Sequence, residues 1–251
     1  MSDFNLWAEK RLEIAENDGI DAAMNGLQVG EMGSDLKKMA FAVDACMDSF
    51  RRALQEGAQA LFVHHGLFWG PAVPLTGTMG ERVRFLMENQ LSLYACHLPL
   101  DRHPELGNNA GIAAALGLEK IEPFGSYKGS KIGFKGQLPE SSNLETLIER
   151  LFGSWESRID ALRFGPSEIR SVAVISGGGP REVSQAIEEG IHLYITGDSS
   201  HEIYHLCREA GINVLFAGHY LTEVFGVKAV SEAVASELGI ETVFLDIPTG
   251  Y

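Results

Sequence analysis

Short runs of apolar residues that end in polar or small residues recur along this chain of 251 residues. Residues 60–63 are all apolar, and two adjacent histidines, His64 and His65, follow them directly. Four apolar residues are too few to span a membrane, and they suit a buried strand. In open α/β sheets, ligands bind beyond the carboxyl ends of the strands. The histidine pair is therefore well placed to hold a metal ion.

The same pattern divides the first half of the chain into alternating strands and helices. Apolar runs bounded by turn residues predict strands at residues 25–30, 39–43, 60–63 and 91–95. The spacing of apolar residues predicts helices at residues 4–18, 48–56, 81–89 and 108–116. Between His97 and Asp101, Pro99 argues against a helix. Alternating strands and helices imply largely parallel pairing of the strands.

The second half of the chain repeats this outline. Strands are predicted at residues 171–175, 193–195, 213–216 and 242–246, and helices at residues 181–189, 201–210 and 227–238. When the halves are aligned at Gly57 and Gly190, which close equivalent helices, His65 falls opposite Asp198. The match of polar positions, beyond the repeated order of elements, indicates an internal duplication.

A histidine followed four residues later by a carboxylate occurs once in each half. The first pair is His97 and Asp101, and the second pair is His219 and Glu223. At this spacing the two side chains share a face if the segment is helical. Both pairs follow a predicted strand, so both are expected at a carboxyl edge of a sheet.

These patterns predict an α/β fold of two similar, interlocked lobes with mainly parallel strands. We place the first lobe at residues 1–125 and the second at residues 126–251, because the segment 117–136 is rich in glycine and lysine. A crevice between the lobes would collect the strand ends of both, and we expect the metal site there.

Composition narrows the class of protein. The formal net charge is −14 and the pI is near 5.0, which argues against general nucleic-acid binding because such binders present a basic face. The three cysteines are widely spaced and suit buried thiols in a reducing compartment. The first residues lack the apolar core of a secretory signal, and no stretch is long and apolar enough to cross a bilayer. We therefore expect a cytoplasmic protein with no membrane partner.

The candidate metal ligands are imidazoles and carboxylates, which suit zinc, manganese, iron or cobalt. Adjacent side chains alternate faces in an extended strand, so His64 and His65 could reach two different ions, or one could leave the strand geometry at Gly66. A carboxylate can bridge two cations and cancel part of their mutual repulsion.

Several motifs together resemble one known family. They are residues 25–30, residues 60–69 with His-His-Gly, residues 97–101, residues 196–198 and residues 217–223, in that order. The resemblance is to the dinuclear-metal family of GTP cyclohydrolase 1 type 2 homologues, also called NGG1-interacting-factor-like proteins, and it covers nearly the whole chain. Two departures stand out: Ala23-Met24 occupies the place of a usual Asp-Asn pair, and Asp198 occupies the place of a glutamate found in many members.

The resemblance implies a ligand set, an assembly and an activity. It implies two divalent ions per chain, held by His64, His65, Asp101, His219 and Glu223 with one carboxylate bridging. It also implies a homohexameric ring with the metal sites facing an inner cavity. His97 would then face the substrate or support the ligands.

A pair of divalent ions favours hydrolysis, because a metal-bound hydroxide is a strong nucleophile at neutral pH. The leading hypothesis is a metal-dependent hydrolase of a small phosphorylated, nucleotide-like or cyclic amide substrate. His97 would act as a general acid or base, and Asp198 and His201 would orient the substrate. The alternatives are a non-enzymatic metal-binding or scaffold ring, and a ring opening of the GTP cyclohydrolase type.

Two further features have competing interpretations. The glycine-rich segment 176–179 precedes a predicted helix, so it could cradle a phosphate or could be a tight strand-to-helix turn. His201 and His205 lie four residues apart, so they could line the metal site or belong to a partly exposed helix face.

Overall fold

The computed structural model describes residues 3–17, 19–33, 35–153 and 159–250. The chain divides into two compact units, and the division is not simply linear. The first unit comprises Met1–Leu106 and Gly226–Ile247, and the second comprises Gly107–Phe225 and Pro248–Tyr251. Each unit is built on one sheet.

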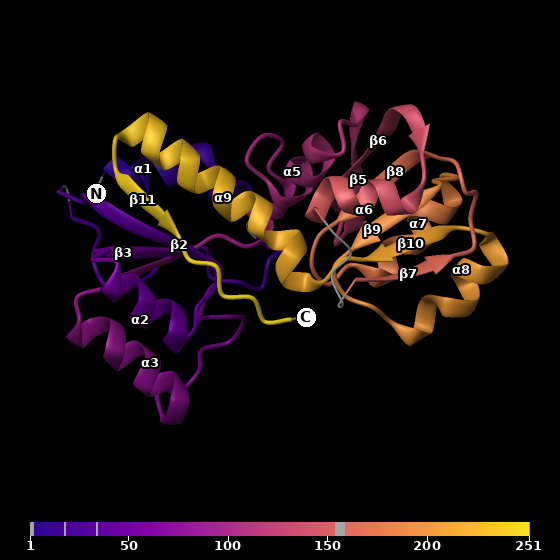
Figure 1. The fold of residues 1–251 in the computed structure, drawn as a ribbon. Helices are drawn as coiled ribbons and strands as arrows, with labels where there is room; N and C mark the ends of the chain where they lie inside the picture. Colours follow the sequence, from indigo (N-terminus) through magenta and orange to yellow (C-terminus); the bar gives the residue numbers. More distant parts are fainter. Residues whose placement is uncertain (1–2, 18, 34, 154–158, 251) are drawn as a thin grey trace. The chain divides into compact units, whose positions relative to one another are not determined.

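The first unit contains a five-stranded sheet in the order β1-β4-β3-β2-β11 (Figure 1). Its strands are β1 (Gly26–Val29), β2 (Lys38–Asp44), β3 (Ala60–His65), β4 (Ser92–Ala95) and β11 (Glu241–Phe244). β11, β2, β3 and β4 run parallel, and β1 pairs antiparallel with β4 at the edge. β3 and β4 are buried on both faces, which explains why their sequences are continuous apolar runs without alternation.

Helices cover both faces of this sheet, as Figure 1 shows. They are α1 (Asp3–Arg11), the 3₁₀ turn η1 (Ile14–Asn17), α2 (Met47–Gln55), α3 (Gly77–Glu88), α4 (Leu98–Arg102) and the last part of α9 (His219–Leu238). Successive β3 side chains point to opposite faces. Leu61 packs in the cluster that contains Leu86 of α3, whereas Phe62 stacks on Tyr94, which meets Phe4 of α1 edge-on. The alternating faces of β3 thus join the two helical layers into one core.

The second unit contains a six-stranded sheet in the order β5-β6-β8-β9-β10-β7. Its strands are β5 (Glu119–Tyr127), β6 (Ser130–Ser142), β7 (Asp160–Arg163), β8 (Ile169–Ile175), β9 (Leu193–Thr196) and β10 (Asn213–Phe216). Its helical elements are α5 (Asn108–Ala115), α6 (Leu144–Phe152), η2 (Pro180–Glu182), α7 (Val183–Glu188), η3 (His201–Ile203) and α8 (Tyr204–Ala210). β8, β9 and β10 run parallel, and β5, β6 and β7 pair antiparallel with their neighbours.

The two sheets share a plan. Each has three parallel strands in sequential order, β2-β3-β4 and β8-β9-β10, and an antiparallel edge strand beside the third of them. In each, the edge strand precedes the three parallel strands along the chain. The mixed α/β fold with two similar sheets is therefore confirmed, and the shared plan is consistent with an internal duplication.

The unit boundaries differ from the expected division at residue 125. β11 pairs with β2, so the end of the chain returns to the first sheet. α5 and the hairpin of β5 and β6 belong to the second unit. The sequence did not predict this hairpin, because most of the β5 side chains are exposed and give no alternating apolar signal.

Two expectations about helices were wrong. α4 spans Leu98–Arg102 with Pro99 in its first turn, where a backbone N–H has no partner within the helix and its loss costs nothing. α9 begins at His219, eight residues before the predicted start at residue 227. In each histidine–carboxylate pair, the residues between the histidine and the carboxylate are therefore helical.

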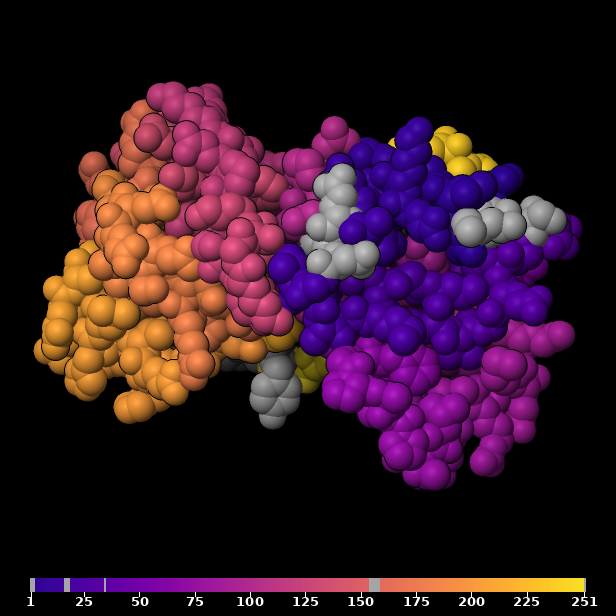
Figure 2. All heavy atoms as spheres, turned by 180° about the vertical axis from the view of Figure 1, so that it is seen from behind, coloured from indigo at the N-terminus to yellow at the C-terminus, as the bar shows by residue number. Residues whose placement is uncertain are grey.

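None of the helices in the described ranges is long and apolar enough to cross a membrane. The segment from residue 70 to residue 90 carries several exposed apolar side chains, namely Val73, Leu75 and Met87. Figure 2 shows this segment, in violet to magenta, on the surface of the first unit.

Candidate metal centre

The strand ends of the first unit bring three histidines together. His64 and His65 are the last residues of β3, and His97 precedes α4 just after β4. The ring centroids of His64 and His65 are 4.6 Å apart, and that of His97 lies 5.1 Å from His64 and 5.7 Å from His65. One ring nitrogen from each histidine lies within 4.8 Å of the others. The two neighbouring histidines therefore reach one cluster, although successive side chains of a strand point to opposite faces.

His64 is fully buried and has a fixed tautomer. Its Nδ1 lies 3.0 Å from the carbonyl oxygen of Cys96. A carbonyl oxygen only accepts hydrogen bonds, so Nδ1 carries the proton and Nε2 carries the lone pair. Nε2 lies 3.5 Å from Oδ1 of Asp101, a buried carboxylate on α4. The two side chains thus present a nitrogen lone pair and a carboxylate oxygen to the same place.

His65 is held in the same way by a carboxylate. Its Nδ1 lies 2.9 Å from Oδ1 of Asp44, the last residue of β2. β2 and β3 are parallel neighbours with Asp44 opposite His65 in the register, so the contact follows from strand pairing. A carboxylate on the far ring nitrogen is typical of metal-binding histidines, because it orients the ring and raises its basicity.

Gly66, which follows the pair, allows the chain to leave the strand. A Cβ there would lie 2.4 Å from Nε2 of Gln28 and 2.6 Å from the Cβ of Ala95. The carbonyl oxygen of Gly66 also accepts a 2.9 Å hydrogen bond from the indole of Trp69. The His-His-Gly motif therefore needs its glycine for close packing behind the two histidines.

His97 is anchored by a residue that the sequence did not single out. Its Nδ1 lies 2.9 Å from Oδ1 of Asp21, and its backbone N–H donates to Oδ1 of Asn25 at 2.7 Å. The ring of His97 also meets the half-exposed Trp69 edge-on, with centroids 4.7 Å apart. A lone aspartate in a loop gives no motif, so sequence reasoning had no signal for Asp21.

Asp21 is a buried carboxylate with a complete set of hydrogen bonds. Oδ1 accepts from the backbone N–H of Ala23 as well as from His97, and Oδ2 accepts from the side chain of Asn25 and the backbone N–H of Leu98. Burial alone would raise its pKa, but the hydrogen bonds from His97, Asn25 and Ala23 outweigh burial and lower the pKa to about 2. Asp21 is therefore ionised at neutral pH and can only accept hydrogen bonds.

The second unit brings together three further candidate residues. His219 and Glu223 lie one turn apart at the start of α9, and Asp198 follows β9. His219 Nδ1 lies 3.0 Å from Asp198 Oδ1, and His219 Nε2 lies 3.2 Å from Glu223 Oε1. Burial lowers the pKa of His219, but the two carboxylates outweigh burial and raise the pKa to about 10. Such a group of one imidazole and two carboxylates attracts a cation.

The glycine-rich loop at residues 176–179 closes over this group. Gly177 has a φ of +59°, and a Cβ there would lie 2.2 Å from Glu223 Oε1 and 3.0 Å from His219 Nε2. The loop N–H groups are largely used inside the protein: Gly177 donates to the Thr222 hydroxyl and Gly179 to the Thr196 hydroxyl. The backbone N–H of residue 176 likewise donates to a buried asparagine side chain. The loop is therefore a close-packed turn, and three of the four N–H groups that a phosphate cradle would use are already engaged.

Asp198 lies against His219, whereas His201 is exposed. Asp198 contacts His219 and is placed to orient that imidazole, and its expected contact with a substrate stays a prediction. His201 is exposed on η3, and His205 is exposed on α8. Their exposure fits the interpretation of a surface helix face.

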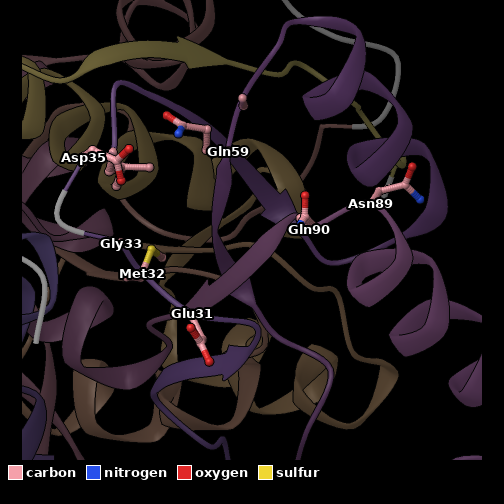
Figure 3. Close-up of a pocket in the computed structure, with 9 residues that line it drawn as sticks. Glu31, Met32, Gly33, Asp35, Gln59, Asn89 and Gln90 are labelled. Carbon is pink, nitrogen blue, oxygen red and sulfur yellow. The ribbon is translucent and has the colours of Figure 1, made fainter.

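A hollow in the first unit lies at the other end of its sheet. Its volume is about 320 Å³, and it is lined by Glu31, Met32, Gly33, Asp35, Leu36, Ala58, Gln59, Asn89 and Gln90 (Figure 3). Gln59 and Gln90 precede β3 and β4, so the hollow opens at the amino ends of the strands that carry the histidines at their carboxyl ends. Oε1 of Gln59 already accepts from the backbone N–H of Lys37. The hollow is therefore separate from the histidine cluster.

Comparison with known proteins identifies the family. The family model described as Duf34/NIF3 (NGG1p interacting factor 3) matches residues 1–250. This chain belongs to the Duf34/NIF3 family. A relative from Archaeoglobus fulgidus, named GTP cyclohydrolase 1 type 2 homolog, is 49% identical over 238 residues, which cover 95% of this chain and 94% of that protein.

Solved structures agree in fold. Protein ybgI, described as of unknown function, matches with a TM-score of 0.89 and 33% identity over 99% of this chain and 98% of that chain. A protein from Thermus thermophilus, TTHA1606, matches with a TM-score of 0.88 and 34% identity over the same shares. The similarity thus extends over the whole Duf34/NIF3 chain.

The donor atoms of this Duf34/NIF3 protein fit a divalent transition metal. The two groups offer imidazole nitrogens and carboxylate oxygens, which are ligands for zinc, manganese and iron. The Nδ1 atoms of His64 and His65 face oxygen acceptors, so their Nε2 atoms carry the lone pairs that a metal would bind. The residues therefore pass the chemical test for a metal site.

Proposed function

We propose that this Duf34/NIF3 protein is a metal-dependent hydrolase that acts on a small phosphorylated, nucleotide-like or cyclic amide substrate. Each chain would hold two divalent ions, of zinc, manganese or iron. The proposed ligands are His64, His65, Asp101, His219 and Glu223. All five are imidazoles or carboxylates, the donor types that these ions prefer.

One observation carries this proposal: the Nδ1 of each of four histidines at strand ends is tied to an oxygen. The partners of His64, His65 and His219 are a carbonyl and two aspartates. Metal-binding histidines almost always donate their second N–H to an oxygen. His97, tied to Asp21, shares the pattern.

In the proposed reaction the ions would activate water and the substrate, and side chains of the protein would move protons and position the groups. When bound, a pair of divalent ions acidifies water and polarises a phosphoryl or carbonyl oxygen. His97 sits beside the ligands His64 and His65 with one side still partly exposed, so it would move a proton between substrate and solvent. His201, exposed on η3, is proposed to contact the substrate, and Asp198 to orient His219.

The first test is metal analysis of protein purified without chelator or affinity nickel. We expect about two ions per wild-type chain and a loss of metal in the double variant His65→Ala, Glu223→Ala. His205→Ala, which removes an exposed imidazole, is the matched control and should keep its metal. Wild-type protein that takes up no zinc, manganese or iron would refute the hydrolase proposal.

The second test separates the reaction classes. A screen with phosphoesters, nucleotides and cyclic amides should show turnover that depends on the metal. GTP belongs in the screen, because relatives carry the name GTP cyclohydrolase 1 type 2 homolog. Metal binding without turnover on any class would favour a non-enzymatic metal-binding or scaffold ring.

We also propose a homohexameric ring for the assembly. Light scattering at several protein concentrations tests it directly, since the chain mass is 27.3 kDa. A mass of one chain at all concentrations would contradict the ring.

A further inference from the structure

We propose that Asp21 is a positioning residue that sets the tautomer of His97 and thereby makes the Nε2 of His97 the reactive nitrogen of the proposed hydrolase. The inference rests on the proposed function, because the use of that nitrogen is the proton transfer assigned there. The tautomer itself is a property of the folded chain and can be tested without a substrate.

The contact between the two residues determines which nitrogen carries the proton. Asp21 Oδ1 lies 2.9 Å from His97 Nδ1, and the side chain of Asp21 is only 3% exposed. An ionised carboxylate can only accept, so Nδ1 must donate and the neutral imidazole keeps its lone pair on Nε2. The low pKa of Asp21 agrees with an ionised group at neutral pH.

Asp21 cannot turn away from His97, because its other hydrogen bonds hold it. Its Oδ2 accepts from the Asn25 side chain at 2.9 Å and from the Leu98 backbone N–H at 3.0 Å. Its Oδ1 also accepts from the Ala23 backbone N–H at 2.9 Å. The carboxylate thus meets four donors from two distant segments of the chain, and it fixes both the ring of His97 and the first turn of α4.

The set of four donors explains why an amide cannot replace this carboxylate. In Asp21→Asn the side chain would offer one acceptor oxygen and one NH₂ group at the same place. Three of the partners are amide N–H groups that cannot accept at nitrogen, whereas the imidazole can exchange tautomers. At the Oδ1 position the NH₂ group faces one fixed donor, the Ala23 N–H, whereas at the Oδ2 position it would face two, the Asn25 amide and the Leu98 N–H. The NH₂ group therefore favours the Oδ1 position, where His97 accepts at Nδ1 and carries its proton on Nε2. In that tautomer the lone pair is on Nδ1, so Nε2 cannot accept a proton from the substrate.

A related aspartate in the serine proteases gives the scale of the effect. There an Asp→Asn change leaves the geometry intact and lowers kcat by about 10⁴-fold, because the histidine takes the wrong tautomer. General acid–base catalysis as a whole contributes about 10² to 10⁴-fold. For Asp21→Asn we expect a fall in kcat of about 10² to 10⁴-fold, with KM and metal content close to wild type.

The decisive experiment is magic-angle-spinning NMR on sedimented full-length protein labelled with ¹³C,¹⁵N-histidine and loaded with Zn²⁺. Carbon–nitrogen correlations distinguish the two ring nitrogens and show which one is protonated. His97→Gln assigns the His97 signals by their loss. Asp48→Asn, which removes one exposed charge that pairs with Arg51, is the matched control for Asp21→Asn.

The expected result is a neutral His97 protonated on Nδ1 in wild type and in Asp48→Asn, and protonated on Nε2 in Asp21→Asn. A wild-type His97 protonated on Nε2 or on both nitrogens overturns the proposal, and this outcome does not depend on the Asp21→Asn variant. An unchanged tautomer in Asp21→Asn overturns it too. Absence of turnover on every substrate would refute the hydrolase while leaving the tautomer result readable, so the two failures are distinguishable.

Discussion

Gly177 offers the sharpest test of how the second unit holds His219 and Glu223. Gly177→Ala adds one methyl group beside Glu223 and His219. The glycine has a φ of +59°, and alanine in this left-handed conformation costs about 1–2 kcal/mol in stability, whatever the side chain contacts. The new Cβ would also stand 2.2 Å from Glu223 Oε1.

The displacement can be worked from the structure. Ordinary contact begins at 3.4 Å, so the oxygen of Glu223 must move from 2.2 Å to 3.4 Å, a shift of about 1.2 Å. Metal sites tolerate deviations of only about 0.2 Å in ligand distance. We therefore expect a loss of at least about tenfold in metal affinity, which corresponds to about 1.4 kcal/mol.

Gly190→Ala is the control for the backbone cost. Gly190 has a φ of +66°, close to that of Gly177, but a Cβ there would meet nothing within 4 Å. Both variants should lose stability by a similar backbone term, about 2–4 °C in Tm for each kcal/mol in a chain of this size. Calorimetry of the metal-free proteins and titration with Zn²⁺ give the two quantities separately.

The two variants should share the backbone cost in stability and differ in metal affinity. If Gly177→Ala binds Zn²⁺ as tightly as Gly190→Ala while both are destabilised alike, then Glu223 is no ligand or the loop yields at little cost. Either outcome would refute the conclusion that the close packing of residues 176–179 fixes Glu223 as a metal ligand.

Three further predictions follow from single contacts. Asp44→Asn removes the carboxylate on Nδ1 of His65 and should lower metal affinity by about 10 to 100-fold in a Zn²⁺ titration; affinity equal to wild type would contradict its supporting role. Leu86→Ala empties a fully buried position and should cost about 2–5 kcal/mol in urea unfolding, whereas Met87→Ala, 59% exposed, should stay within about 0.5 kcal/mol. The pKa of Asp21 falls from 3.8 to about 2, so its contribution of about 2 kcal/mol is complete above about pH 5 and is lost as the pH drops through about 2; a stability difference between wild type and Asp21→Asn that does not shrink over this range would contradict it.

Much of the first sheet could be predicted from the chain alone. β2, β3 and β4 are short runs of apolar residues because parallel strands are covered on both faces, and this signal is local. The turn at Gly57 that ends α2 is local too. The hairpin of β5 and β6 escaped prediction because most side chains of β5 are exposed and carry no such pattern. The last strand was expected in the second lobe, whereas β11 pairs with β2 in the first sheet. Pairing between strands distant in the chain depends on the packed core, which the strand's own sequence does not reveal.

The sequence by itself determined where the candidate ligands lie, since His64, His65 and the two histidine–carboxylate pairs follow strands that are visible as apolar runs. It also determined the family. Only the tertiary structure decided how the ligands are held, because Asp21 and His97 are separated by 76 residues and meet through folding. The same is true of the glycine wall around Glu223, where the available space depends on three segments packing together. Apolar periodicity is written locally in the chain, whereas hydrogen bonds to a buried imidazole exist only after distant segments have been brought into contact.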